Sequence, residues 1–297
     1  MSALLRLSFA FLFVSAASAT AFADKRGDET KKQKTAAEAN IKSAMLTAAH
    51  VETDDLLVYA TMPEAKAKPL AAAMQKTYAV AVKSLKVESS DKLWPGKLTV
   101  YVFSDTRQYK SFALQAFKRQ PPKQESFFSD TKGDVPYVLD GAVLGEKPTD
   151  VQIATEASSL VAAAVLVRQV GSLMDKTPTW LQLGFGQAAY LRADGNAAKL
   201  TAHKAKLRAM YTKNQGQSFK VANVTGDQAT ADAELLSVSL AEYLAFGPNA
   251  AKFPMILGAL KPSDDQPNPT FDTALAAADW KWMDLETAWQ KWVFTGK

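Results

Sequence analysis

The sequence predicts a helix-rich α+β fold, with a small mixed sheet near the N-terminal part of the chain and a helical C-terminal part. Three observations support this prediction. Leu98 to Phe103 has the β-branched and aromatic composition of a strand. Two further strand candidates, within Val51 to Thr61 and Pro136 to Leu144, also precede residue 149. From residue 149 onward, apolar residues recur at helical spacing in one segment after another.

The composition is that of a globular protein and excludes several kinds of site. Of the 297 residues, 47% are hydrophobic and 22% are charged, which is enough to form a sizeable core. The chain has no cysteine, so it has no disulfide, no cysteine nucleophile and no thiolate metal site. The net charge of +5 comes from interspersed residues, with one compact basic cluster at Lys31 to Lys34. Without a basic stripe on a folded element, this pattern does not favour nucleic-acid binding.

Residues 1–23 are predicted to be a secretory signal peptide. Arg6 provides a positive start, Leu7 to Val14 is an apolar run, and Ala21 to Ala23 forms a small-x-small cleavage pattern. We expect cleavage after Ala23, with Ala19 as a second candidate point. The mature chain has no other stretch apolar enough to suggest a transmembrane segment, so we expect an exported protein, periplasmic or extracellular.

The first part of the mature chain alternates polar and periodic segments. Residues 24–35 are charged and are expected to be a polar linker, disordered or loosely attached, before a single domain that spans residues 36–297. Helical spacing predicts a short helix over Thr35 to His50 and a long helix over Pro63 to Val87. Between them, Leu56 to Ala60 is a strand candidate.

The strand at Leu98 to Phe103 leads into a helix. Ser104 or Asp105 can cap this helix, and Pro121-Pro122 is expected to end it. Residues 123–134 are polar and are predicted to form a loop.

The helical C-terminal half begins at about residue 149 with the most apolar helix of the chain. This helix, predicted from Asp150 to Met174, has almost no polar face and should be buried on most sides. Trp289 and Trp292 recur at helical spacing and predict a packing face that holds the C-terminus. The other predicted helices are Thr179 to Arg192, Ala197 to Lys213, Ala229 to Phe246, Ala250 to Leu260 and Asp284 to Val293.

Two neighbouring segments resemble a known zinc site. The apolar helix contains Thr155-Glu156-Ala157-Ser158-Ser159, at the place of a His-Glu-x-x-His motif. The next helix opens Pro178-Thr179-Trp180-Leu181-Gln182-Leu183-Gly184, which is similar to the Trp-Leu-x-Glu-Gly segment of gluzincins. Together with the order of elements over residues 50–295, these segments resemble the peptidase MA-like, thermolysin-type zincin domains of exported bacterial proteins.

The resemblance implies a degenerate zinc site. In the family, two histidines and a later acidic residue hold zinc, and a glutamate takes a proton from zinc-bound water. Thr155 and Ser159 stand at the histidine positions, Leu183 at the acidic position, and Glu156 at the general-base position. Because all three ligand positions lack a good zinc ligand, we expect no metal, no cofactor and no catalytic residue beyond the vestigial Glu156.

Other catalytic interpretations find little support. The two histidines, His50 and His203, lie in separate predicted helices without a ligand-spaced partner. Ser158 and Ser159 have no nearby histidine or lysine to act as a base. Gly184-Phe185-Gly186 lacks the preceding strand and the following lysine of a phosphate loop, and its glycines favour close helix packing.

Three hypotheses follow for function. The first is an exported, catalytically inactive zincin-like protein with a binding or scaffolding role, and a peptide or envelope polymer as candidate partner. The second is a metal-independent hydrolase that uses Glu156. The third is a structural component of an envelope assembly.

Overall fold

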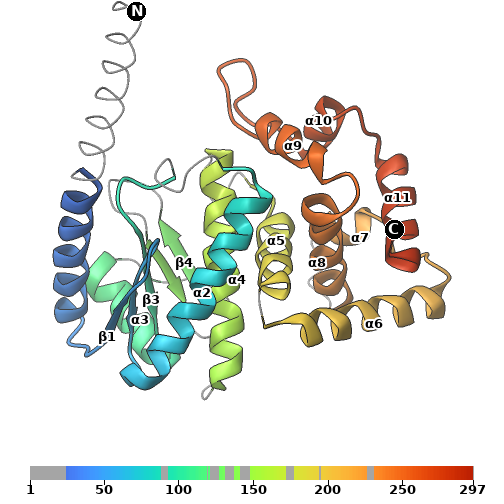
Figure 1. Cartoon of the computed structure of the whole chain (residues 1–297). Helices are drawn as coiled ribbons and strands as arrows, with labels where there is room; N and C mark the ends of the chain where they lie inside the picture. The colour runs from blue at the N-terminus through green and yellow to red at the C-terminus, as the bar shows by residue number, and fades with distance from the viewer. Residues whose placement is uncertain are drawn as a thin grey trace, which may run out of the picture.

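Five short strands form one mixed sheet in the N-terminal half of the computed structural model (Figure 1). The strand order is β1-β2-β3-β5-β4, in which β2, β3 and β5 are parallel and the edge strands β1 and β4 are antiparallel to their neighbours. The strands are Ala49–Glu52 (β1), Leu56–Ala60 (β2), Leu98–Val102 (β3), Phe127–Asp130 (β4) and Tyr137–Asp140 (β5). The structure describes residues 25–87, 93–118, 120, 127–130, 137–140, 148–171, 177–193, 195–225 and 231–296.

The sheet is covered on both faces. Every residue of β2 and β3 is buried, as expected for parallel strands that lie between two layers of helices. One face of the sheet packs against α2 (Glu64–Ser84) and α4 (Asp150–Val170). The opposite face, which includes Tyr59 and Tyr101, packs against the helix of residues 25–43 and against α3 (Thr106–Phe117). The predicted α+β fold, with a mixed sheet in the N-terminal part and a helical C-terminal part, is therefore confirmed.

The prediction of a disordered or loosely attached linker over residues 24–35 is wrong for the residues that the structure describes. Residues 25–43 are helical, and a buried stripe runs along the helix at spacings of three and four residues. The stripe consists of Thr30, Gln33, Ala37, Ile41 and Ala44. Most residues of the stripe are small or polar, so the sequence shows no run of large apolar residues at helical spacing there. The helix predicted up to His50 also extends too far, because His50 lies in β1.

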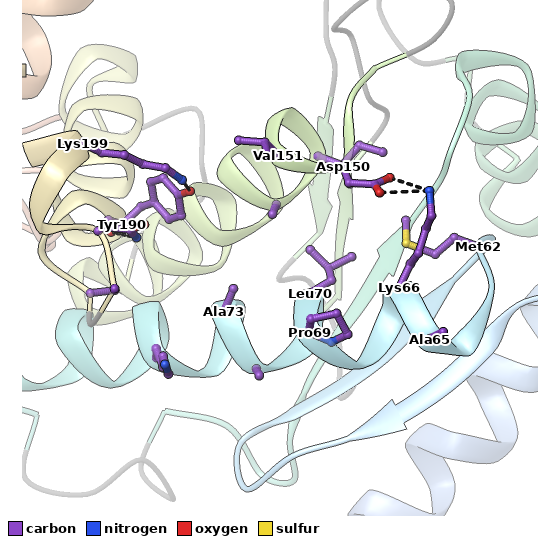
Figure 2. Close-up of a pocket in the computed structure, with 17 residues that line it drawn as sticks. Met62, Ala65, Lys66, Pro69, Leu70, Ala73, Asp150, Val151, Tyr190 and Lys199 are labelled. Atoms are coloured by element: carbon purple, nitrogen blue, oxygen red, sulfur yellow. Dashed lines mark hydrogen bonds and ion pairs between the residues drawn. The ribbon is translucent and has the colours of Figure 1, made fainter. Parts of the chain in front are cut away.

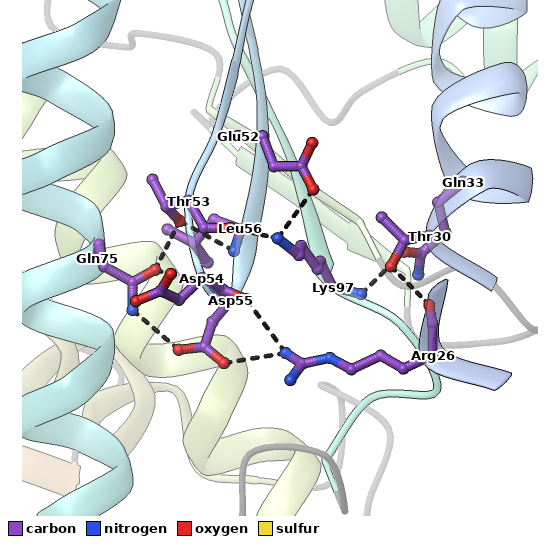
Figure 3. Close-up of polar contacts among 10 residues, drawn as sticks. All are labelled: Arg26, Thr30, Gln33, Glu52, Thr53, Asp54, Asp55, Leu56, Gln75 and Lys97. Atoms are coloured by element: carbon purple, nitrogen blue, oxygen red, sulfur yellow. Dashed lines mark hydrogen bonds and ion pairs between the residues drawn. The ribbon is translucent and has the colours of Figure 1, made fainter. Parts of the chain in front are cut away.

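Polar contacts attach this N-terminal helix to the turn between β1 and β2 and to the residue before β3 (Figure 3). Gln33 is fully buried, and its Oε1 accepts a hydrogen bond from the Lys97 backbone N–H at 2.9 Å. Arg26 Nη2 donates to Asp55 Oδ1 at 3.2 Å. From the other layer, Gln75 Nε2 of α2 donates to Asp55 Oδ2 at 2.9 Å. Asp55 thus connects the helices on both sides of the sheet.

The apolar helix α4 lies at the centre of the molecule, between α2 and α5 (Thr179–Arg192) (Figure 1). A capping box of Thr149 and Gln152 begins the helix, and Gly171 ends it in a left-handed conformation, with φ of 66°. Within the described residues, α4 is the one helix long and apolar enough to cross a membrane. Since its most apolar stretch is 67% buried by neighbouring helices, packing accounts for its composition.

The remaining helices build the C-terminal part around α8, which packs against α5. Trp289 of the last helix is fully buried and donates its indole N–H to Ser239 Oγ of α8 at 3.0 Å, which confirms the predicted packing face. The elements are α6 (Ala197–Asn214), α7 (Ala222–Thr225), α8 (Ala231–Phe246), the 3₁₀ helix η2 (Ala250–Lys252), α9 (Phe253–Ala259), α10 (Phe271–Ala277) and α11 (Trp282–Thr295).

Several other expectations need correction or lie outside the described residues. Residues 123–134 were expected to form a loop, but they contain β4. The list of predicted helices omitted α10, which is capped by Thr270. The predicted signal peptide over residues 1–23, its cleavage point at Ala23, and Pro121-Pro122 lie outside the described residues.

Candidate functional site

The two residues at the histidine positions of the zincin motif are hydrogen-bonded within the protein. Thr155 Oγ1 donates to the Val151 carbonyl at 2.8 Å and forms a second hydrogen bond, of 3.1 Å, with the Tyr190 hydroxyl of α5. Ser159 Oγ donates to the Thr155 carbonyl at 2.8 Å. Both hydroxyls therefore have protein partners, and the structure brings these two positions together on one face of α4.

Two glycines bring α5 into close contact with its neighbours. A Cβ added to Gly186 would lie 2.3 Å from the Ser159 carbonyl oxygen of α4. A Cβ added to Gly184 would lie 2.4 Å from the Ser237 carbonyl oxygen of α8. Real Cβ atoms are not found at such distances, so glycine is required at both positions. The predicted role of these glycines in close helix packing is confirmed.

Leu183 and Glu156 complete the predicted set. Leu183 lies one helical turn before Gly186 on α5, and its side chain is 39% exposed. Glu156 is half-buried on α4. The structure thus places all four predicted positions on the α4–α5 pair. Among the described residues, no group of three His, Cys, Asp or Glu side chains lies together in a way that could hold a metal ion.

The two histidines lie on separate elements. His50 is in β1, where its ring stacks on Tyr59 with centroids 4.7 Å apart, and burial lowers the pKa of its imidazole. His203 is in α6, and burial also lowers the pKa of its imidazole. Burial favours the neutral form of both rings.

A pocket of about 590 Å³ lies between helices next to the predicted zinc-ligand position Thr155, whose hydrogen-bond partner Tyr190 lines it (Figure 2). We call it the four-helix pocket, because its walls come from α2, the first turns of α4, the end of α5 and the start of α6. Its apolar lining includes Pro69, Leu70, Ala73, Ile153 and Ala154, with Met62 near the Lys66 end (Figure 2). Its volume is in the range of pockets that bind small molecules.

Charged side chains lie at both ends of the four-helix pocket. At one end, Lys66 Nζ forms an ion pair with Asp150 Oδ2 at 2.9 Å. At the other end, Lys199 Nζ donates to the Tyr190 hydroxyl and lies 4.7 Å from the centre of the Tyr190 ring. Lys76 also lines the pocket. Among the residues that the structure describes, three lysines and one carboxylate therefore line the pocket.

Tyr190 connects the pocket to the degenerate zinc positions. Its side chain lines the four-helix pocket, and its hydroxyl bonds to both Lys199 and Thr155. Sequence reasoning did not find this pocket, because its residues come from four helices and form no local motif. Pro69 lines the pocket from within the continuous helix α2, so it gave no local signal of a pocket.

Comparison with known proteins found no family model, no curated protein and no solved structure that matches the chain. The function must therefore be argued from the geometry of these sites.

Proposed function

We propose that this chain is an exported binding protein without catalytic activity, built on a zincin-like framework that has lost its metal site. One observation carries the proposal: the side chains at the two histidine positions, Thr155 and Ser159, are hydrogen-bonded to protein groups. Each hydroxyl thereby fulfils a structural role within the α4–α5 pair.

The chemistry of the third position also supports loss of the metal. Zinc sites in proteins use Cys, His, Asp and Glu side chains, and Leu183 offers no ligand atom. Threonine and serine hydroxyls are protonated at neutral pH and are poor ligands for zinc. A hydrolytic site of the zincin kind needs the metal to activate its water, so Glu156 alone does not supply that chemistry.

The four-helix pocket supports a binding role. It lies next to the degenerate positions and shares Tyr190 with them. A preformed cavity with an apolar middle and a few polar groups is typical of small-molecule sites. We therefore favour a small ligand over the extended peptide or envelope polymer expected from the sequence.

Metal content and hydrolysis test the proposal. Purified mature protein should contain no stoichiometric zinc by elemental analysis, and a chelator should leave its melting temperature unchanged. Casein and mixed peptide substrates should remain intact over a long incubation. Stoichiometric zinc, or hydrolysis that the chelator abolishes, would overturn the proposal.

The variant Glu156→Gln distinguishes the hydrolase hypothesis. It replaces the carboxylate with an amide of nearly the same shape. If the wild type hydrolyses a substrate in the presence of chelator and Glu156→Gln does not, the protein is a metal-independent hydrolase and the binding proposal is wrong.

A further inference from the structure

We propose that the four-helix pocket binds an anionic amphiphile, with an apolar chain in the middle of the pocket and a carboxylate or phosphate head at its α6 end. This inference rests on the proposed binding function and specifies the class of ligand. Three features carry it: the apolar middle, the unequal charge of the described residues at the two ends, and the start of α6, which Asn196 does not cap.

The middle of the pocket suits a hydrocarbon chain. Leu70 and Ala73 of α2 lie along it, opposite Ile153 of α4 (Figure 2 shows the first two). Val151 also lines the pocket, although its side chain is 61% exposed. An apolar chain that covered Val151 would remove this surface from water, which is favourable.

The end of the pocket near Lys66 is electrically balanced. Figure 2 shows the Lys66 ammonium and the Asp150 carboxylate pointing toward each other. An anion placed there would have to compete with Asp150 for the same lysine. This end therefore offers little attraction for a negatively charged head.

The opposite end carries lysine charges that no described carboxylate balances. Lys199 bonds to the neutral hydroxyl of Tyr190, and it forms no ion pair with a described residue. Lys76 lies one helical turn beyond Ala73 on α2, toward this end, and has neither a hydrogen bond nor an ion pair with any described residue. An anionic head between these lysines would form charge-assisted hydrogen bonds, which are stronger than neutral ones.

The start of α6 adds to this attraction. Asn196 is the N-cap residue of α6, but its side-chain Nδ2 donates to the Tyr190 carbonyl at 2.7 Å and does not cap the helix. Asn196 therefore leaves the backbone N–H groups in the first turn of α6 without a cap from its own side chain. Asn196 and Gly195 both line the pocket, so the positive end of an 18-residue helix lies at the same end of the pocket as Lys199, which is in its first turn.

The placement of these groups predicts the orientation of the ligand. The head lies at the end formed by Lys76, Lys199 and the start of α6, and the chain runs along α2 toward Pro69 and Met62. Carboxylate and phosphate heads share the required negative charge. Neutral and cationic amphiphiles lack it and should bind poorly.

Titration with short amphiphiles tests the inference. Mature protein is titrated in a calorimeter with dodecanoate, dodecyl phosphate, dodecanol and dodecyltrimethylammonium, each below its micellar concentration. We expect one saturable site per chain for at least one of the two anions, and at least tenfold weaker binding of dodecanol and of the cation. The two anions together identify whether the head is a carboxylate or a phosphate.

Matched variants locate the site. The double variant Lys76→Met/Lys199→Met should bind the preferred anion at least tenfold more weakly. The control Lys83→Met/Lys213→Met removes two exposed lysines from the same two helices outside the pocket, and it should bind within twofold of the wild type. Ala73→Phe fills the middle of the pocket without changing charge and should also weaken binding at least tenfold.

Three outcomes overturn the inference: no saturable binding of either anion, equal binding of dodecanol, or unchanged binding by Lys76→Met/Lys199→Met. Each of these leaves the proposed function standing, as long as the protein contains no zinc and hydrolyses nothing. Chelator-sensitive hydrolysis would instead overturn the proposed function. The two failures are therefore distinguishable.

Discussion

Glu242 of α8 shows how single side chains hold the C-terminal part together. Its carboxylate is fully buried, and Oε1 accepts hydrogen bonds from Arg192 Nη2 at 2.6 Å and Nε at 3.1 Å. Lys204 Nζ of α6 lies 3.7 Å from the same oxygen. A buried charge is costly without a partner, so Glu242 depends on Arg192 and Lys204. Since these two residues belong to α5 and α6, the contacts hold both helices to α8.

The Arg192–Glu242 pair yields a prediction about stability. Arg192→Met leaves the carboxylate buried with Lys204 as its remaining ion-pair partner and should lower the free energy of unfolding by about 3 kcal/mol. Glu242→Gln removes the buried charge but keeps an oxygen acceptor for Arg192, so it should cost about 1 kcal/mol. Urea unfolding measures both variants. A larger loss for Glu242→Gln than for Arg192→Met would contradict this account.

His203 yields a prediction about pH. Burial, chiefly, holds the pKa of its imidazole below 6.5; the nearby Glu242 carboxylate raises it, and Lys206 and Lys204 lower it further. As pH falls below 6.5, the unfolded chain takes up a proton at His203 before the folded chain does. Stability should therefore be greatest above this pH and decrease between pH 7.5 and pH 5.

The variant His203→Gln isolates this effect. It cannot take up the proton, so its stability should decrease less than that of the wild type over the same pH interval. Urea unfolding of both proteins at the two pH values measures the difference. An identical decrease in both would show that other groups, such as His50, account for the pH dependence.

At the scale of elements, close helix packing around α5 is the main constraint. Gly186→Ala places a Cβ against the Ser159 carbonyl, and backbone atoms on both sides would have to move apart. We expect a loss of about 3 kcal/mol in the free energy of unfolding. Gly258 of α9 has no atom within 4 Å of its added Cβ, so Gly258→Ala should gain up to about 1 kcal/mol from helix propensity. Thermal or urea unfolding of both variants measures the difference. Equal effects of Gly186→Ala and Gly258→Ala on stability would contradict the prediction.

The N-terminal helix is a second element whose attachment can be tested. Ala37 lies on its buried stripe and is 1% exposed, whereas Ala39 of the same helix is exposed. Ala37→Asp buries a charge against the aromatic face of the sheet and should lower the free energy of unfolding by at least about 2 kcal/mol. Ala39→Asp makes the same chemical change in water and should cost less than about 0.5 kcal/mol. If both variants unfolded at the same urea concentration, the helix would not be firmly attached to the sheet.

At the scale of the whole molecule, the proposed zincin-like framework can be tested by introducing the family's zinc ligands. The variant Thr155→His/Ser159→His/Leu183→Glu replaces each degenerate position with the family's ligand. If the framework is zincin-like, this variant should bind one zinc ion and should melt at a higher temperature with zinc than without it. At a zinc concentration 100-fold above Kd, zinc binding should raise the free energy of unfolding by about 2.7 kcal/mol.

Two controls complete this experiment. Leu183→Glu alone supplies one ligand and should bind no stoichiometric zinc. Histidine is larger than the buried Ser159 that it replaces, so the triple variant must be shown to fold. Circular dichroism provides this check. A folded triple variant that retained no more zinc than Leu183→Glu would contradict the zincin-like framework.

The sequence by itself determined the elements that carry a strong local signal. The β-branched run of β3, the helical periodicity of α2, the apolar composition of α4, and a cap of α3 at Ser104 or Asp105 were all predicted, because each depends on neighbouring residues alone. The structure places the cap at Asp105. The same local reading placed Thr155, Glu156 and Ser159 on one helix. It also predicted that the glycines of α5 permit close packing.

Only the tertiary structure decided the features that depend on distant residues. The N-terminal helix is held by buried Gln33 and by the Arg26–Asp55 pair, and polar contacts of this kind leave no apolar periodicity. The edge strands β1 and β4 have four residues each and become strands only by pairing with their neighbours. The four-helix pocket exists because α2, α4, α5 and α6 meet, and no segment of the sequence contains more than part of its lining.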